Sequence, residues 1–172
     1  MQFAKDSFYM AMRERLAALN PARTVTLNGA TRPAVIAGEN EPVGFAERLP
    51  NAFYLDWGAT RPIKSHQDGT ILVEMDCTIW YHTLGASESG VDRGRALGEL
   101  EQELWNICQP PRTPKRDFTQ APSQDLGTMI FWRMPQNEDL PGSDRVALRQ
   151  NPGARLERRA RLSIFFFPEV QP

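Results

Sequence analysis

The sequence predicts an α+β fold, a mostly antiparallel sheet with two main helices packed on one face. Two segments show the apolar spacing of amphipathic helices, and six shorter segments alternate or cluster as strands. Turns rich in proline and glycine separate these segments. A chain of 172 residues fits one domain, so residues 1–172 are expected to form a single α+β unit.

The first helix is expected to follow Asp6 and Ser7, which are N-cap residue types, and to end at Asn20-Pro21. Its apolar side chains recur at helical spacing: Phe8, Met12, Leu16 and Leu19. These four side chains predict one buried stripe.

A hairpin is predicted over residues 24–37 around Asn28-Gly29-Ala30, because Asn-Gly supplies the positive φ angles of a tight turn. Pro33 cannot donate to a sheet ladder, so the second arm, residues 31–37, is expected at an edge. A loop, a short strand over 53–57 and a second loop over 58–69 follow.

The strongest strand signal spans residues 70–81, where two sets of side chains alternate. One set comprises Ile71, Val73, Met75, Cys77, Ile79 and Tyr81, and the other Leu72, Glu74, Asp76, Thr78, Trp80 and His82. At about 3.3 Å per residue this strand extends about 40 Å, which predicts a central strand that protrudes from the core.

A second helix is expected to end at Cys108, before Pro110-Pro111. Leu97, Leu100, Leu104 and Ile107 provide its apolar spacing. Interior glycines cost a helix about 1 kcal/mol each against alanine. Gly90, Gly94 and Gly98 therefore indicate either a late start near Arg95 or a close backbone contact on that face.

Residues 109–151 are rich in proline and are expected to form a loop-rich insertion with one strand over 128–134. The final strand is predicted over 154–167, with a cationic face that includes Arg155, Arg159 and Arg161. Opposite charges on neighbouring strands attract, so we expect Arg159 and Arg161 to pair with Glu74 and Asp76 of the long strand.

The formal net charge of −1 excludes an overall basic field that would draw the chain onto nucleic acid. The charge is nevertheless divided along the chain. Residues 1–108 carry 14 acidic and 10 basic side chains, whereas residues 109–172 carry 7 and 10. This division predicts attraction between the two parts, within one copy or between neighbouring copies.

No motif for catalysis, cofactor binding or metal binding is found, and no cofactor is expected. His66 and His82 are the two histidines, which leaves little material for acid–base chemistry. Cys77 and Cys108 lack the spacing of a metal or redox site and are expected to be reduced core thiols. The aromatic sets at 53–57 and 165–167 are expected in the core or in a subunit interface.

No apolar run predicts a secretory signal or a membrane span, and no membrane partner is expected. The chain is therefore expected to be made and kept in a cytoplasm-like compartment.

The order of elements resembles that of the tail terminator or tail-completion proteins of tailed phages. The resemblance rests on Phe8-x3-Met12-x3-Leu16, on the strand end Thr78-Ile79-Trp80-Tyr81, and on Asp92-Arg93-Gly94-Arg95-Ala96-Leu97-Gly98-Glu99-Leu100. Residues 70–108 match the strand-then-helix unit of that family and residues 154–167 match its closing strand. The insertion at 109–151 departs from its smallest members.

The resemblance implies a structural virion protein, not an enzyme, which is assembled in the host cytoplasm. Its copies would form a ring, commonly a hexamer, that caps the tail-tube protein and ends its polymerisation. The ring would also offer a docking surface to the head–tail connector protein. DNA would be present only as the passing content of the lumen.

Two loops, 83–92 and 135–153, are the predicted contact segments. Their candidate residues are Ser87, Glu88, Asp92, Glu138, Asp139, Asp144 and Arg145. Glu74, Asp76, Arg155, Arg159 and Arg161 are candidates for a subunit interface or for the lumen, with their mutual pairing favoured. Two alternatives stay open: another head-completion or neck adaptor, and a small hydrolase or ligand-binding domain with a pocket at His66, His82 or Glu74.

Overall fold

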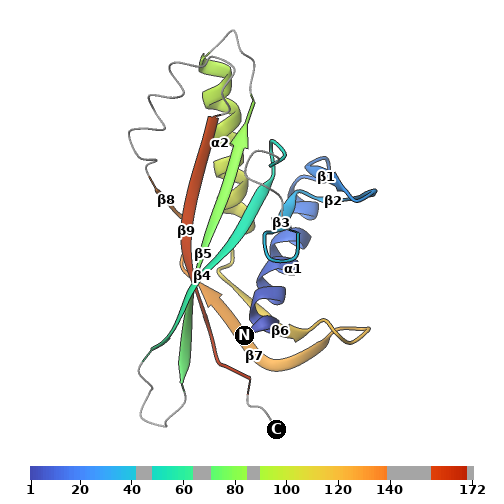
Figure 1. Ribbon diagram of the computed structural model, residues 1–172, viewed down its shortest axis with the longest axis vertical. Helices are drawn as coiled ribbons and strands as arrows, with labels where there is room; N and C mark the ends of the chain where they lie inside the picture. Colours follow the sequence, from blue (N-terminus) through green and yellow to red (C-terminus); the bar gives the residue numbers. More distant parts are fainter. Residues whose placement is uncertain (42–47, 64–70, 85–89, 139–155, 170–172) are drawn as a thin grey trace.

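The computed structural model describes residues 1–41, 48–63, 71–84, 90–138 and 156–169, which form a mixed α+β fold with two helices and a curled sheet (Figure 1). The elements in chain order are α1 (Gln2–Leu19), β1 (Thr24–Leu27), β2 (Ala30–Pro33), β3 (Val35–Ala37), β4 (Phe53–Ile63), β5 (Leu72–Thr83), α2 (Gly90–Ile107), β6 (Arg112–Asp117), β7 (Gln124–Trp132), β8 (Gln136–Glu138) and β9 (Leu156–Phe166).

The main sheet has the strand order β3-β4-β5-β9-β7-β6, and β8 adds to β9 beside β7. β3 pairs with β4 in parallel, and the other pairs of this sheet are antiparallel. β5 lies between β4 and β9, and its pairing with β9 runs from Val73 opposite Phe166 to Thr83 opposite Leu156. The prediction that the long strand is central is therefore confirmed.

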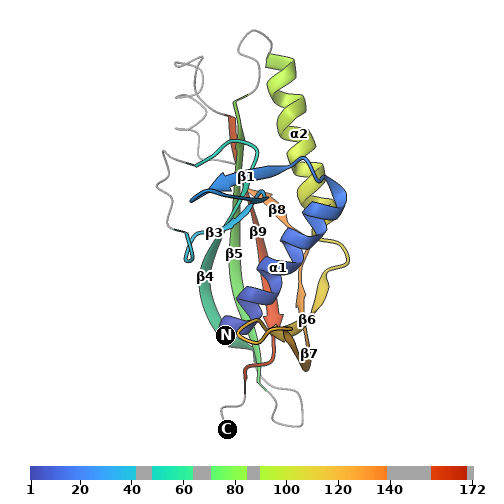
Figure 2. The same ribbon diagram turned by 90° about the vertical axis from the view of Figure 1, so that its right-hand side faces the viewer.

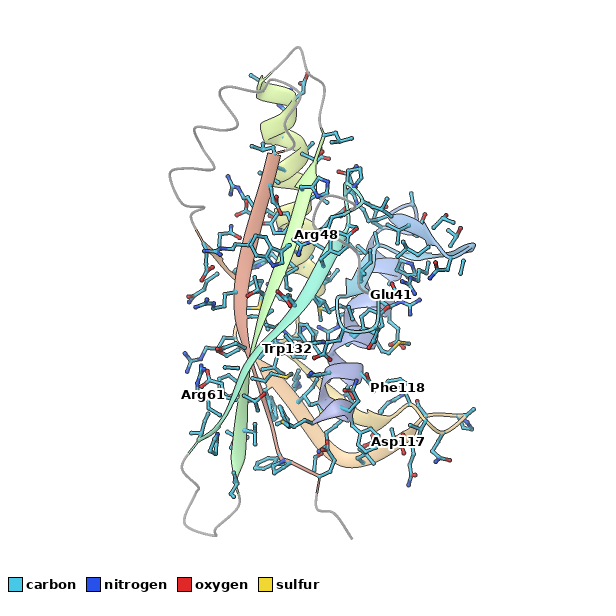
Figure 3. The ribbon with its side chains drawn as sticks, in the orientation of Figure 1. Glu41, Arg48, Arg61, Asp117, Phe118 and Trp132 are labelled. Atoms are coloured by element: carbon cyan, nitrogen blue, oxygen red, sulfur yellow. The ribbon has the colours of Figure 1, made fainter. Side chains whose placement is uncertain are left out.

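The core lies between the sheet and the two helices (Figure 2). Alternate side chains of β5 from Val73 to Tyr81 are buried, as the alternation predicts. The Phe8 ring of α1 packs edge-on against Trp132 of β7, with 5.1 Å between ring centroids. Trp132, labelled in Figure 3, also donates a hydrogen bond of 2.9 Å to the Cys108 carbonyl at the end of α2. Both helices are thereby fastened to one side of the sheet.

α1 begins at Gln2, so the predicted start after Ser7 is wrong. Ser7 is buried, and its hydroxyl donates to the Phe3 carbonyl at 2.6 Å. The same hydroxyl accepts a hydrogen bond of 2.9 Å from the backbone N–H of Arg116 in β6. A serine that can cap a helix can also bond back to the preceding turn, and here it ties α1 to the outer strand β6.

The turn at Asn28 and Gly29 has the positive φ angles predicted for it, 50° and 79°. β1 and β2 form a separate two-stranded sheet around this turn. The predicted second arm over residues 31–37 divides at Ala34, and its last part becomes β3 at the edge of the main sheet.

β4 extends to Ile63, beyond the predicted end at residue 57. The register shifts between Trp57 and Thr60, and this bulge breaks the alternation from which strands are predicted. Within the bulge a Cβ on Gly58 would lie 3.0 Å from the Cβ of Asp76. Beyond the short pairing with β3, β4 forms strand pairs with β5 alone, so its far half is a free edge in the described part of the sheet.

α2 begins at Gly90, so the late start near Arg95 is wrong. A Cβ on Gly94 or Gly98 would meet no atom within 4 Å, so the alternative of a close backbone contact is wrong as well. Burial of Leu97, Leu100 and the apolar residues after them holds this helix despite its glycines. Among the described residues, neither helix has the length and apolar character of a membrane span.

The region expected to be loop-rich contains β6, β7 and β8 as far as the structure describes it. β6 and β7 form a hairpin of the main sheet, and only the strand over 128–134 was predicted there. Pro114 is tolerated within β6 because this strand lies at the edge of the sheet. Residues 139–151 of the predicted insertion lie outside the described residues.

Candidate functional site

The face of the main sheet that points away from the helices, called the outer face below, carries charged and aromatic side chains in register. Residues that pair across strands share a face, so each set forms a row across the sheet. The lower row comprises Arg61, Glu74, Phe165, Phe131 and Arg112, on five successive strands. The upper row comprises Tyr54, Trp80, Arg159 and Glu138.

Arg61 holds two carboxylates at one end of the lower row. Its Nε lies 2.9 Å from Glu74 Oε2, and its two terminal nitrogens lie 2.9 and 3.0 Å from the oxygens of Asp76. These hydrogen bonds raise the pKa of Arg61 above its ordinary value, with Asp76 contributing most. A hydrogen bond from Ser163 and then the Arg61 guanidinium lower the pKa of Glu74, against the effect of desolvation.

The expected pairing of Glu74 and Asp76 with Arg159 and Arg161 is wrong. Arg159 and Arg161 both bind Glu138 of β8, at 2.8 and 3.2 Å. The strands at 70–81 and 154–167 are neighbours as expected. However, the two carboxylates and the two arginines each bind an oppositely charged residue on a third strand. Those third strands are the far half of β4 and the three-residue β8, and the sequence pattern predicted neither.

Trp80 lies between two guanidinium groups in the upper row. Arg48 and Arg159 lie 5.1 and 5.5 Å from its ring centroid, a cation–π arrangement. Arg48 also lies 5.4 Å from the Tyr54 ring centroid and 3.6 Å from a carboxylate oxygen of Glu157. Figure 3 shows Arg48 and Arg61 at different heights along the long strands. The charged side chains at the Arg61 end of the lower row and around Trp80 therefore find their partners within the chain.

The opposite end of the lower row is different. The Phe131 patch, defined as Phe131, Phe165, Arg112 and Arg133, has an aromatic centre and two cations. Phe131 is 42% exposed, and the Arg133 guanidinium lies 5.4 Å from the Phe165 ring centroid. Within the described ranges, neither Arg112 nor Arg133 forms an ion pair. Alternation within the predicted strand over 128–134 separates Phe131 from the buried Ile130 and Trp132, and it places Arg133 on the same side as Phe131. Arg112 could not be assigned to this surface because it comes from β6, a strand that the sequence did not predict.

The predicted contact residues are divided between described and undescribed segments. Glu138 lies in β8 rather than in a loop, and Asp92 lies in the first turn of α2. The remaining candidates lie outside the described residues: Ser87, Glu88, Asp139, Asp144, Arg145 and Arg155.

The structure does not bring the candidate catalytic residues together. Glu74 lies on the outer face, whereas His82 is 2% exposed near the other end of β5. At about 3.3 Å per residue they are about 26 Å apart, and His66 lies outside the described residues. Across the described part of the chain, no three His, Cys, Asp or Glu side chains are close enough to hold a metal ion.

Both cysteines are free and buried, as predicted. Burial raises the pKa of the Cys108 thiol to about 12 and that of Cys77 well above its ordinary value. Both side chains are therefore protonated thiols at neutral pH, the form that is unreactive as a nucleophile.

An open cleft of about 380 Å³, the α1–α2 cleft, lies on the helix side of the molecule. Its lining comprises Leu19, Asn20, Arg23, Glu99, Gln102, Glu103 and Asn106. Arg23 binds Glu103 through two hydrogen bonds of 2.9 and 3.0 Å, and Asn20 donates to the same carboxylate at 2.6 Å. Leu19, expected in the buried stripe, is instead 47% exposed.

Comparison with known proteins adds no family to this description. The chain matches no model of a known protein family, and no curated protein sequence matches it significantly.

Proposed function

We propose that this chain is a structural subunit of a tailed-phage tail, a tail terminator whose copies form a ring on the end of the tail tube. The observation that carries this proposal is the outer face, a broad surface of aromatic and arginine side chains set in paired strands. Such composition is typical of surfaces that bind proteins. The helices pack against the other side of the sheet, so among the described residues no helix covers the outer face.

The order of elements supports the same proposal. The long strand β5 is followed directly by α2, and the closing strand β9 returns to the side of β5. This is the strand-then-helix unit with a closing strand on which the resemblance to tail terminators rests. The hairpin of β6 and β7 extends the same sheet by two strands.

The proposed mechanism is geometric. A ring, commonly a hexamer in that family, presents a tube-like surface on one side and a different surface on the other. The next ring of tail-tube protein then has nothing to bind, and the head–tail connector gains a docking surface. Most charges of the outer face are neutralised within the subunit, so a lumen formed by it would hold DNA weakly.

The alternatives are less well supported. Further helices would favour a neck adaptor, and the described residues contain only the helices α1 and α2. A hydrolase was expected to have a pocket at His82 or Glu74, and these residues lie far apart. That Glu74 and Asp76 line a lumen stays a prediction, and Arg61 neutralises part of their charge.

The proposal is tested by polymerising tail-tube protein with and without this chain and measuring tube lengths by negative-stain electron microscopy. A terminator gives shorter tubes that carry a ring at one end. Tubes as long as those of the untreated control would contradict the proposal. Glu14→Ala provides a matched control, because Glu14 is an exposed residue of α1 away from the outer face, and it should cap tubes like the wild type.

A further inference from the structure

We infer that one copy of this chain binds the next through the Phe131 patch, which enters the α1–α2 cleft of the neighbouring copy. The inference rests on the proposed ring and names the two surfaces that meet in it.

The Phe131 patch has the features of a binding surface. Phe131 is exposed and is flanked by Arg112, its cross-strand neighbour, and by Arg133, which covers Phe165. Aromatic residues and arginine are enriched in protein interfaces relative to the rest of the protein surface. Both arginines lack a carboxylate partner in the described part of their own chain, so a partner that offers one gains charge-assisted hydrogen bonds.

The α1–α2 cleft offers the complementary groups. Leu19 supplies an exposed apolar wall, and Glu99 supplies a carboxylate that forms no ion pair in the described residues. Glu103 is already bound by Arg23, so Glu99 is the charge left for a partner. The last turn of α1 contains no basic residue, and its C-terminal carbonyls add to the negative potential of the cleft.

The two surfaces lie on opposite sides of the core. Trp132 points from β7 toward Phe8 and the end of α2, so its neighbour Phe131 points away from the helices. Leu97 and Leu100 are the core contacts of α2, and Glu99 between them faces outward. A contact between such surfaces joins the patch of one copy to the cleft of another. Each pair then still has one free cleft and one free patch, to which further copies can bind. Repetition of this contact closes a ring when the rotation per copy divides a full turn.

The division of charge along the chain agrees with a contact between the patch and the cleft. The patch residues all come from the part with excess positive charge, residues 109–172, and the cleft residues all come from residues 1–108. A contact between neighbouring copies therefore brings the two oppositely charged parts together.

Cysteine cross-linking tests which surfaces meet. The doubly substituted chain Gln102→Cys, Met129→Cys places one thiol in the cleft and one beside Phe131 on the same face of β7, and it keeps the proposed contact side chains. It is treated with a short bismaleimide, to which the native thiols are inert because Cys77 and Cys108 are fully buried. We expect a ladder of covalent dimers, trimers and larger species, and no ladder from either single variant. A control with Gln102→Cys and Ile71→Cys should stay monomeric, because Ile71 is 51% exposed but lies outside both surfaces and outside the predicted contact loops. Self-linking of Met129→Cys alone, or no ladder from the double variant, would overturn the inference.

Charge exchange separates this inference from the proposed function. Glu99→Arg alone, or Arg112→Glu with Arg133→Glu, should raise the concentration needed to cap tubes at least tenfold, and the triple variant should recover most of the loss. Thermal melting confirms that each variant is folded. If the wild type caps tubes and these variants cap equally well, the surfaces are wrong and the function stands. If the cross-linked ladder forms but tubes grow uncapped, the contact stands and the terminator function fails.

Discussion

The two ends of the outer face differ in how their charges are satisfied. At the Arg61 end and around Trp80, arginines bind carboxylates or aromatic rings of the same chain. At the Phe131 end, Arg112 and Arg133 have no acidic partner in the described residues, and the ring beside them is exposed. Charges satisfied internally stabilise the subunit, whereas unsatisfied charges on a rigid sheet suit a partner. Substitutions at the first end should therefore change stability, and substitutions at the second should change assembly.

The largest effect is expected at the core residue that joins β7 to α1 and to the end of α2. Trp132→Ala removes a buried ring, its contact with Phe8 and its hydrogen bond to Cys108. We expect a loss of about 3–5 kcal/mol in the free energy of unfolding, measured by denaturant titration. An unchanged midpoint would show that β7 does not depend on its contact with the helices.

The contrast between the two ends is tested by two aromatic substitutions. Trp80→Ala removes the ring between Arg48 and Arg159 and should destabilise the chain by about 2 kcal/mol. Phe131→Ala should change stability by no more than about 0.5 kcal/mol and should weaken assembly. Denaturant titration and cross-linking measure these two effects. Equal stability losses would remove the distinction.

Gly58→Ala tests the bulge that positions Arg61. The added Cβ would lie 3.0 Å from the Cβ of Asp76, so the strands must shift to admit it. Overpacking of this kind costs about 1–2 kcal/mol. Ala59→Gly, in the same bulge, is the matched control and should cost less. Thermal melting distinguishes the two variants, and a larger loss for Ala59→Gly would contradict the close approach.

The smallest expected effect is a pH dependence at the Arg61 end. The pKa of Glu74 is lowered in the folded chain, so the unfolded chain binds the proton more readily. Stability from this group is therefore present above the ordinary value of 4.5 and is lost as the pH falls through the folded value. Denaturant titrations at several acidic pH values should show a shallower loss in Arg61→Gln than in the wild type.

Sequence patterns predicted the elements whose burial alternates without interruption. β5 and β9 were predicted as long neighbouring strands because apolar side chains alternate in both, and those from Val73 to Tyr81 and from Ala160 to Phe166 are buried. β7 was predicted for its last part because Ile130 and Trp132 alternate with Phe131. In these strands one face is buried and the other is not, so the alternation in the sequence shows which side chains face the core.

Features that depend on interrupted patterns or on distant segments were missed. The bulge after Trp57 interrupts the alternation, so the far half of β4 was not predicted. Arg61, the partner of Glu74 and Asp76, lies in that half and was missed with it. β8 is too short for an alternation, so Glu138 could not be assigned to the arginines of β9. The α1–α2 cleft joins two helices far apart in sequence, and Leu19 at the end of α1 had no signal that distinguished it from the buried stripe.

The free edge of β4 has a consequence for the behaviour of concentrated solutions. At the other edge of the sheet α1 covers β6, whereas the far half of β4 has backbone groups that a foreign strand could meet. The bulge distorts this edge, Pro62 has no N–H to offer, and Arg61 adds a charge. These are the devices that prevent sheets from joining edge to edge into fibrils. We therefore expect that concentrated copies of this chain do not join through this edge of the sheet.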